Sequence, residues 1–322
     1  MTTLYLKYRP QKIDEIDITT VRESLANILK SGNIPHAFLF SGPRGTGKTS
    51  LARILAKAIN CLAKPDSALQ DDLPCNKCDS CISITTGSNI DVIEMDAASN
   101  RGIDDIRNLR DQVKLAPSSS KAKIYIIDEC HMLTTEASNA LLKTLEEPPS
   151  HVYFILATTN PEKLIDTITS RVTIIQFKKA DTDEILRCLK RVVKGENAKV
   201  TDDELIKIAK LSKGSFRDAV KILEQHFSDD SFLNLGSDDA DSLVEFVLKK
   251  DLEKSLEIIK RSNSIDHLTD QIIEIIHQKM IKEKTKELIP LIEFILTSKE
   301  MVKYSPIEEL PLEMAIIKWC KL

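Results

Sequence analysis

An eight-residue segment near the N-terminus has the glycines, the lysine and the hydroxyl group that phosphate-binding loops use. Residues 42–49 read GPRGTGKT and fit the pattern G-x-x-x-x-G-K-[ST]. The glycines let main-chain N–H groups turn inward around phosphates, and the helix expected to follow adds the partial positive charge of its N-terminus. Lys48 would reach the β- and γ-phosphates, and Thr49 would ligate Mg²⁺. The residues of this predicted nucleotide site are Gly42, Pro43, Arg44, Gly45, Thr46, Gly47, Lys48, Thr49 and Ser50.

Two carboxylates follow a later apolar run. Asp128 and Glu129 come directly after residues 124–127 (IYII), which predict a buried strand. In parallel sheets, the carboxyl end of such a strand lies beside the phosphate loop. Asp128 would therefore hold the Mg²⁺, and Glu129 would polarise the attacking water. An ordinary acidic strand end is the alternative, and we interpret the nearby His131 as structural.

Four of the seven cysteines lie close together in the pattern C-x13-C-x2-C-x2-C. Four thiolates at about 2.3 Å from Zn²⁺ complete a tetrahedron with no open position, so we expect a structural zinc site. Iron–sulfur ligation and free thiols stay open as alternatives, although nothing else in the sequence suggests electron transfer. The predicted ligands are Cys61, Cys75, Cys78 and Cys81.

Composition excludes some classes of protein. The net charge of −4 disfavours a surface that is basic throughout, so any DNA contact must come from a local patch. Aromatic residues make up only 5%, which disfavours base stacking as the main mode of binding. No apolar run reaches 18 residues, and the first residues lack the pattern of a secretory signal. We therefore expect no membrane association and a cytoplasmic location.

The elements that must position these residues show first as short apolar runs typical of buried strands. Helical patterns such as 50–60 and 135–145 separate most of the runs, which predicts an α/β fold with a mainly parallel sheet and helices on both faces. The first run precedes the phosphate motif and a helical pattern follows it, a context that disfavours a glycine-rich turn without a ligand. The predicted strands are 38–40, 92–95, 124–127, 152–156 and 172–175.

The later part of the chain is helical. Helical spacing covers 181–194, 201–211 and 215–226, and Thr201 with Glu204 fits a capping box. Residues 228–241 are rich in Asp, Ser and Gly and predict a linker. Beyond them, residues 242–322 show helical spacing without a catalytic pattern. We expect an oligomerisation or scaffold role for this last part.

Several further motifs, together with the phosphate loop and the cysteines, resemble the gamma/tau subunit of DNA polymerase III. That subunit belongs to the bacterial replicative clamp loader. The resemblance is close over residues 4–228 and weaker beyond, with a match again at 300–319. The motifs that carry it are 8–11 (YRPQ), 96–102 (DAASNRG), 127–149 (IDECHMLTTEASNALLKTLEEPP), 157–161 (ATTNP), 170–171 (SR) and 214–219 (GSFRDA).

The resemblance implies an AAA+ ATPase of three domains. These are a nucleotide-binding domain at 1–179 with an inserted zinc module at 61–81, a helical lid at 180–228 and a helical collar at 229–322. It implies ATP, Mg²⁺ and Zn²⁺ as cofactors. The implied partners are delta, delta-prime and further gamma copies, the sliding clamp and primer–template DNA.

The resemblance also assigns roles to single residues. Thr159 would sense the γ-phosphate, and Arg217 in the lid would contact the same nucleotide. Arg171 would act as an arginine finger on the ATP of a neighbouring subunit. Arg9 and Pro10 would line the adenine pocket. Without the family pattern, ordinary salt bridges and a strand-end hydrogen bond would be the simpler interpretations of Arg171, Arg217 and Thr159.

Some features depart from the family pattern. Val172 stands where the family has Cys, residues 17–20 (DITT) replace a Val-Gly-Gln stretch, and the collar is shorter. The sequence shows no tau-like tail, so we expect a form that resembles gamma. Two alternatives stay open, a delta-prime-like structural subunit and a motor of the Holliday-junction type. Arg101 and Arg107 are candidate DNA contacts.

Overall fold

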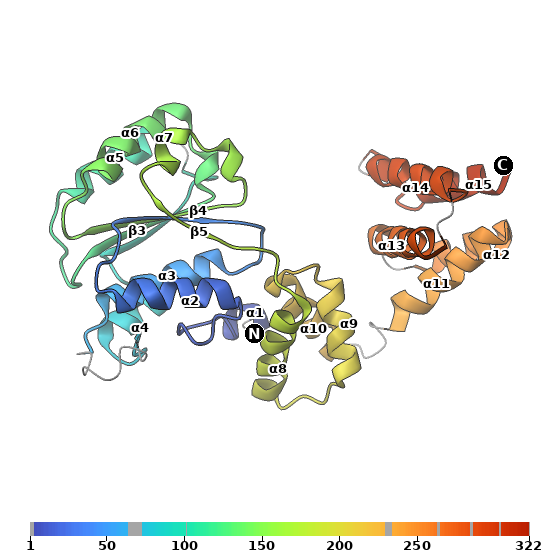
Figure 1. The fold of residues 1–322 in the computed structure, drawn as a ribbon, viewed down its shortest axis with the longest axis horizontal. Coiled ribbons are helices and arrows are strands. Elements are labelled where there is room, and N and C mark those ends of the chain that lie inside the picture. The colour runs from blue at the N-terminus through green and yellow to red at the C-terminus, as the bar shows by residue number, and fades with distance from the viewer. Residues whose placement is uncertain are drawn as a thin grey trace. The chain divides into compact units, whose positions relative to one another are not determined.

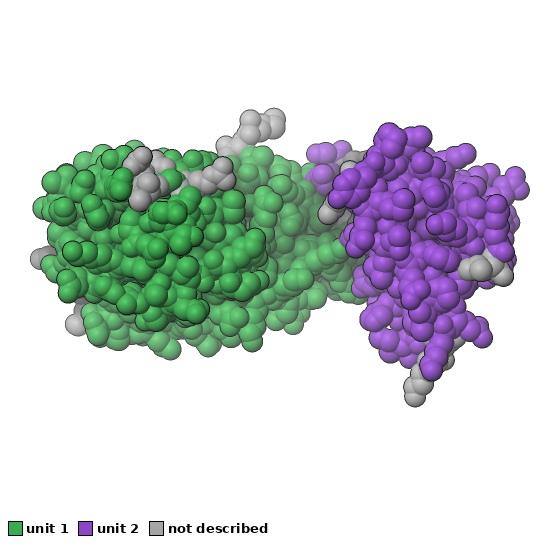
Figure 2. Space-filling model, turned by 90° about the horizontal axis from the view of Figure 1, so that it is seen from above, with its two compact units in different colours: residues 1–224 green, residues 225–322 purple. Residues whose placement is uncertain are grey.

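The computed structural model describes residues 3–63, 73–100, 102–228, 234–262, 265–283, 286–302 and 304–321. The chain divides into two compact units, Met1–Glu224 and Gln225–Leu322, which Figure 2 colours green and purple. Each unit has its own apolar core. The further division of the first unit into a domain at 1–179 and a lid at 180–228 stays a prediction.

A parallel sheet of five strands organises the first unit, as the apolar runs predicted. The strand order is β2-β3-β4-β1-β5, and every neighbouring pair is parallel. The three central strands are buried on both faces, which explains why they appear in the sequence as continuous apolar runs. The strands are β1 (Ala37–Ser41), β2 (Val92–Asp96), β3 (Lys123–Asp128), β4 (Val152–Thr158) and β5 (Thr173–Gln176).

Helices cover both faces of this sheet, so the expected α/β layering is confirmed (Figure 1). Alternate residues of β1 serve the two faces: Phe38 and Phe40 pack on one side, and Ala37 and Leu39 pack on the other. One layer contains α2 (Thr19–Lys30) and α3 (Lys48–Asn60), with α4 (Asp79–Thr86) below them. The other layer contains α5 (Ile103–Val113), α6 (Thr135–Glu146) and α7 (Asp166–Thr169).

Three helices follow the sheet, at the positions that helical spacing predicted. They are α8 (Thr182–Glu196), α9 (Asp202–Leu211) and α10 (Phe216–Ser228). The capping box expected at Thr201 and Glu204 is confirmed, and Asp181 with Glu184 forms another at the start of α8. The remaining short elements of this unit are α1 (Leu4–Lys7), η2 (Cys130–Met132) and η3 (Pro161–Lys163).

The second unit consists of helices wherever the structure describes it. They are α11 (Asn234–Leu248), α12 (Leu252–Arg261), α13 (Ile265–Glu283), α14 (Ile289–Val302) and α15 (Leu310–Lys321). They enclose an apolar core that includes Leu243, Ile259 and Ile272. Among the described residues of the whole chain, no helix is both long and apolar enough to cross a membrane.

The linker prediction for 228–241 was wrong over its second half. Helix α11 already begins at Asn234, and residues 229–233 lie outside the described part of the chain. Ala240 is buried at helical spacing with Leu243, Val244 and Val247. The burial of that apolar face outweighs the preference of the neighbouring Asp and Ser residues for turns.

Candidate functional site

A cavity of about 700 Å³ lies in the first unit, at the carboxyl ends of the parallel strands. Its volume falls within the range of roughly 300–1,000 Å³ that small-molecule sites occupy. Crevices at this edge of a parallel sheet are the usual binding sites in α/β folds. The predicted site residues that line the cavity are Arg9, Pro10, Arg44, Gly45, Thr46, Gly47, Lys48, Thr49, Ser50, Asp128, Glu129, Thr159 and Arg217.

The glycines of the phosphate loop allow it to pass close to other backbone. Gly42 has φ of 145°, and a Cβ atom there would lie 2.1 Å from the carbonyl oxygen of Phe177. Gly45 has φ of 79°, and its Cβ would lie 2.1 Å from Oγ of Ser215, just before α10. Gly45 also accepts a hydrogen bond from the N–H of Phe216 at 3.0 Å. The loop therefore packs against Phe177, just after β5, and against the start of α10.

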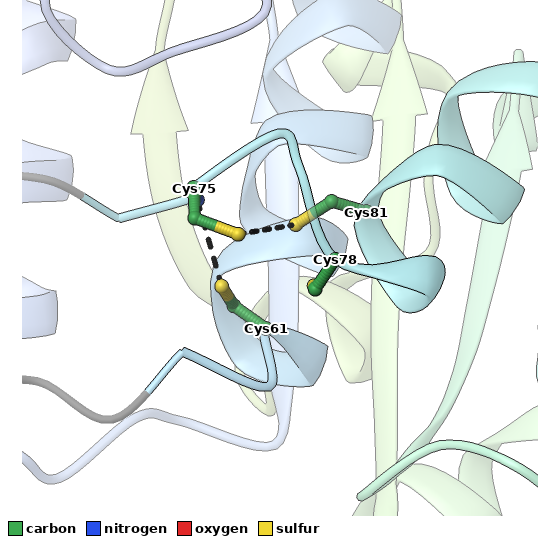
Figure 3. A group of neighbouring side chains, drawn as sticks. All are labelled: Cys61, Cys75, Cys78 and Cys81. Carbon is green, nitrogen blue, oxygen red and sulfur yellow. Dashed lines mark hydrogen bonds between the residues drawn. The ribbon is translucent and has the colours of Figure 1, made fainter.

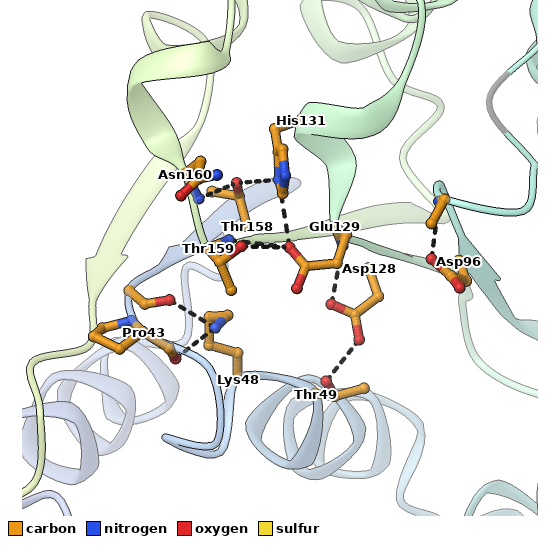
Figure 4. Close-up of polar contacts among 12 residues, drawn as sticks. Pro43, Lys48, Thr49, Asp96, Asp128, Glu129, His131, Thr158, Thr159 and Asn160 are labelled. Atoms are coloured by element: carbon orange, nitrogen blue, oxygen red, sulfur yellow. Dashed lines mark hydrogen bonds and ion pairs between the residues drawn. The ribbon is translucent and has the colours of Figure 1, made fainter. Parts of the chain in front are cut away.

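Lys48, the first residue of α3, lies folded back over this loop. Its Nζ donates to the carbonyl oxygens of Gly42 at 2.7 Å and Pro43 at 2.8 Å (Figure 4). Burial lowers the pKa of the Lys48 ammonium, while the carboxylates of Glu129 and Asp128 act in the opposite direction. The amine thus lies at the helix N-terminus, close to two acidic side chains.

Thr49 and Asp128 meet between the loop and β3. The Thr49 hydroxyl donates to Oδ2 of Asp128 at 2.9 Å, and the N–H of Glu129 donates to Oδ1 of the same carboxylate at 3.0 Å. These two side chains, 79 residues apart in the chain, provide a hydroxyl and a carboxylate oxygen next to each other (Figure 4). Such hard oxygen ligands suit Mg²⁺.

Glu129 points toward Thr159 at the end of β4 (Figure 4). Its Oε2 accepts hydrogen bonds from the Thr159 hydroxyl at 2.9 Å and from the Thr159 N–H at 3.2 Å. Glu129 has φ of 48°, in the left-handed region that non-glycine residues seldom occupy. Residues with such strained backbone are often found at functional sites. The backbone thus holds this carboxylate over the cavity instead of letting it continue along the strand.

His131 contributes to this arrangement in a way that the sequence did not reveal. Its Nδ1 lies 3.0 Å from Oγ1 of Thr158 and 3.4 Å from Oε2 of Glu129. Its side chain is only 7% exposed. In the sequence, the only signal for the contact between His131 and Glu129 is that they lie two residues apart. The contact itself depends on the turn formed by η2.

Arg9 and Pro10 form part of the cavity wall, together with several apolar side chains. Nε of Arg9 donates to the hydroxyl of Ser50 at 2.8 Å. Burial and the nearby Arg53 lower the pKa of Arg9 to about 10, so it stays cationic at neutral pH. Other residues of this wall, which the sequence did not predict, are Tyr8, Ile16, Asp17, Ile18, Phe177, Cys188 and Val220.

Asp17 and Ile18 belong to the stretch that departs from the family pattern, and they form part of this wall. Asp17 is buried and makes an ion pair with Arg191 of α8, with 2.7 Å between Oδ2 and Nη2. Nη2 of Arg187 donates to the Asp17 carbonyl oxygen at 2.8 Å. The departing segment is therefore anchored to α8.

The two other predicted arginines lie in different surroundings. Arg217 lines the cavity from α10, and its guanidinium lies 5.8 Å from the centre of the Tyr5 ring. Arg171 does not line the cavity. Its Nε donates to Oε1 of Glu146 at 2.6 Å and its Nη1 donates to the Thr167 carbonyl oxygen at 2.8 Å. Arg107 lies on α5, and Arg101 falls outside the described residues.

The four predicted metal ligands lie together beyond the far end of α3 (Figure 3). Their sulfur atoms are all within 4.8 Å of one another, and those of Cys75 and Cys81 are 4.0 Å apart. A tetrahedral Zn–S₄ centre has an S···S edge of about 3.8 Å, so these positions fit a metal ion after small shifts. Cys61 directly follows α3, Cys78 caps α4 and Cys81 lies within α4.

The thiols of this cluster differ in acidity. Burial raises the pKa of Cys81 and Cys61. Burial acts in the same direction on Cys75, but hydrogen bonds from the N–H groups of Lys77 and Cys78 lower its pKa to about 6. Thiolates are the form that ligates metals, so the N–H groups of this loop favour ligation at Cys75.

Comparisons with known proteins agree with these features. The family model described as "DNA polymerase III, delta subunit" matches residues 19–181. The DNA polymerase III subunit tau of Bacillus subtilis is 49% identical over 226 residues, which are 70% of this chain and 39% of that protein. The tau subunit of Escherichia coli is 41% identical over 268 residues, or 80% of this chain and 41% of that protein. The chain thus spans about two fifths of the length of these curated relatives.

Solved structures support the fold independently. The Thermotoga maritima RuvB Holliday junction branch migration motor superposes with a TM-score of 0.51 at 19% identity, over 75% of this chain and 79% of that one. A variant of the same motor gives a TM-score of 0.52 at 18% identity, over 96% and 91% of the two chains. At such low identity the likeness concerns the fold alone, which is of the AAA+ class.

Proposed function

Because the chain belongs to the DNA polymerase III subunit family and resembles its gamma and tau members, we propose that it is the ATP-hydrolysing motor subunit of a replicative clamp loader. The observation that carries this proposal is the convergence of Lys48, Thr49, Asp128, Glu129 and Thr159 around one cavity. The proposed domains are those expected from the sequence, a nucleotide-binding domain at 1–179, a lid at 180–228 and a collar at 229–322.

ATP would bind with its phosphates against the loop and its base against the apolar wall near Pro10. Lys48 would leave the carbonyl oxygens of Gly42 and Pro43 and pair with the β- and γ-phosphates. Thr49 and Asp128 would hold a Mg²⁺ ion, which neutralises charge on the phosphate oxygens. Arg217, from α10, would add positive charge from the side of the lid.

Hydrolysis requires a base for the attacking water, and Glu129 is the candidate. The water oxygen bonds to the γ-phosphorus, while the bond between the γ-phosphorus and the oxygen bridging to the β-phosphate breaks and ADP leaves. Glu129 accepts the proton of the water. Thr159 bonds this carboxylate through both its hydroxyl and its N–H. When the γ-phosphate competes for the Thr159 hydroxyl, Glu129 becomes freer to reach the water.

Arg171 fits a role on a neighbouring subunit, because it lies outside its own cavity while Glu146 and the Thr167 carbonyl oxygen hold it in place. A guanidinium placed on the γ-phosphate of an adjacent subunit would neutralise charge in the transition state. Turnover would then require an assembled ring, so the proposed partners are delta, delta-prime and further copies of this chain.

In that ring, bound ATP would favour the state that opens the sliding clamp and grips primer–template DNA, and hydrolysis would release the clamp. The proposed location is the cytoplasm, where bacterial DNA polymerase III acts. The cysteine cluster would hold Zn²⁺ as a structural centre, because four sulfur atoms fill all its positions.

The test is ATPase activity in a reconstituted complex with the clamp, measured with and without primed DNA. We expect activity that rises with clamp and DNA and disappears in Lys48→Ala. A complex that loads clamps while this chain binds no nucleotide would instead favour the delta-prime-like role. Unwinding of four-way junctions without any effect of the clamp would favour the Holliday-junction motor.

A further inference from the structure

Lys57 is a buried cation that the proposed reaction does not use. It lies on α3, nine residues after Lys48 and four before Cys61, and is 1% exposed. Its Nζ donates to three acceptors: the Gln11 carbonyl oxygen at 3.0 Å, Gln11 Oε1 at 2.7 Å and Asn76 Oδ1 at 2.7 Å. Burial of an ammonium costs free energy unless it is hydrogen-bonded, so Lys57 keeps Gln11 and Asn76 close to α3.

Asn76 connects Lys57 with the cysteine cluster. It lies between Cys75 and Cys78 with φ of 55°, and its Oδ1 accepts the hydrogen bond from Lys57 of α3. Its Nδ2 donates to the Gln11 carbonyl oxygen at 3.1 Å. The loop that carries two of the predicted ligands therefore contacts both Lys57 and Gln11.

Gln11 connects the same contacts with the nucleotide cavity. Its Nε2 donates to the Arg9 carbonyl oxygen at 3.1 Å, and the Arg9 guanidinium donates to Ser50 at 2.8 Å. Arg9, Pro10 and Ser50 all line the cavity. A continuous series of hydrogen bonds thus leads from the Cys75–Cys78 loop, through Lys57 and Gln11, to the cavity wall.

We propose that a metal ion at the four cysteines strengthens nucleotide binding through Asn76, Lys57 and Gln11, which are positioning residues for the Arg9–Pro10 wall. A bound ion fixes the Cys75–Cys78 loop and keeps Asn76 against Gln11. A wall that is already ordered loses less conformational freedom when the nucleotide binds. The inference rests on the proposed function, because it concerns the affinity of the same site.

The simpler alternative is that the metal only stabilises the fold. In that case, removal of the ion would lower the thermal midpoint, but the folded protein would keep its affinity for nucleotide. Coupling between the two sites predicts something else, because a coupling free energy acts in both directions. Bound ADP should then raise the affinity for Zn²⁺, measured as an equilibrium competition with a chelator.

The experiment uses the full chain reconstituted with Zn²⁺ and measures the Kd for Mg²⁺-ADP with a fluorescent analogue. In Asn76→Gly the four cysteines remain, and glycine accepts the positive φ without strain. We expect this variant to keep its Zn²⁺ but to bind the nucleotide about fivefold or more weakly, the lower end of typical couplings. Lys57→Met should give a similar loss.

Lys77→Met is the matched control, because it removes a positive charge from the same loop at an exposed position. Its Kd should equal that of the unmodified chain. The coupling is refuted if the Zn²⁺-loaded Asn76→Gly protein binds nucleotide as tightly as the parent and ADP leaves the equilibrium affinity for Zn²⁺ unchanged. Absence of nucleotide binding by the Zn²⁺-loaded parent chain would contradict the proposed function itself.

Discussion

The hydroxyl of Thr49 donates a hydrogen bond of 2.9 Å to Oδ2 of Asp128, and this contact joins the phosphate loop to the end of β3. The two residues are the proposed ligands of Mg²⁺, and they approach each other because β1 and β3 end at the same edge of the sheet. A Mg²⁺ ion placed there would be ligated by the Thr49 hydroxyl and an Asp128 carboxylate oxygen, and these two groups would no longer be hydrogen-bonded to each other.

Replacement of Thr49 tests this shared role. Thr49→Ala should reduce the gain in ADP affinity that Mg²⁺ brings by about tenfold, since a hydrogen bond or ligand to a charged group is worth about 1.5–3 kcal/mol. Calorimetric titrations with and without Mg²⁺ measure this gain. Thr49→Ser keeps the hydroxyl and serves as control. An equal effect of Mg²⁺ in all three proteins would contradict the assignment.

Loss of the Glu129 carboxylate should separate binding from hydrolysis. Glu129→Gln should lower kcat in the assembled complex by about 10²–10⁴-fold, as removal of a general base does, with the Kd for ATP within about twofold of the parent. Thr159→Val retains the base but removes the hydroxyl, so it should reduce the preference for ATP over ADP. A Glu129→Gln complex with full turnover would exclude this residue as the base.

Arg171 should matter only in the assembled ring. Because it lies outside its own cavity, Arg171→Ala should leave the Kd for ATP of the isolated chain unchanged. In the complex, the ATPase rate should fall by about 10³-fold or more, the usual effect of losing an arginine finger. Glu146→Gln weakens only the contact that holds the guanidinium, and we expect a smaller loss. Normal turnover in the Arg171→Ala complex would remove the finger role.

Two glycines of the phosphate loop should differ in their tolerance of a side chain. Gly42→Ala places a Cβ 2.1 Å from the Phe177 carbonyl oxygen, which is main chain and cannot rotate away. Gly47→Ala meets no atom within 4 Å, so it should cost only the backbone strain of its φ of 98°, about 1–2 kcal/mol. Thermal denaturation should show the larger loss for Gly42→Ala. Equal midpoints would contradict this close approach.

Asp91 should stabilise the fold in a pH-dependent manner. Burial would raise the pKa of its carboxyl, but the N–H groups of Ser118, Ser119 and Ser120, at 2.7–2.9 Å, lower it overall. A pKa lowered in the folded state adds stability above the unfolded value of about 3.9, and this stability is lost as the pH falls through the folded value.

We therefore expect Asp91→Asn to reduce the free energy of unfolding by about 1–3 kcal/mol at pH 7, with a smaller difference below about pH 4. Urea denaturation at these two pH values measures the difference in the free energy of unfolding between Asp91→Asn and the parent. Asp111→Asn is the control, because this exposed carboxylate forms a surface ion pair with Lys114 at 3.4 Å and its loss should change stability by less than about 1 kcal/mol. A pH-independent difference would exclude a role for the Asp91 charge.

The sequence by itself determined the features that depend on short-range patterns. The phosphate motif between an apolar run and a helical pattern located the loop. The apolar runs located the five strands of the sheet, three of which are central parallel strands buried on both faces. The cysteine spacing likewise indicated a cluster, and the four sulfur atoms do lie together.

Only the tertiary structure decided which residues from distant segments meet. Lys57 contacts Gln11 across 46 residues, and Asp17 pairs with Arg191 across 174. It also decided that α11 begins at Asn234, since burial of Ala240 outweighs local turn preference. Such contacts depend on how helices pack on the sheet, and a local pattern of residue types carries no information about which partner that packing brings near.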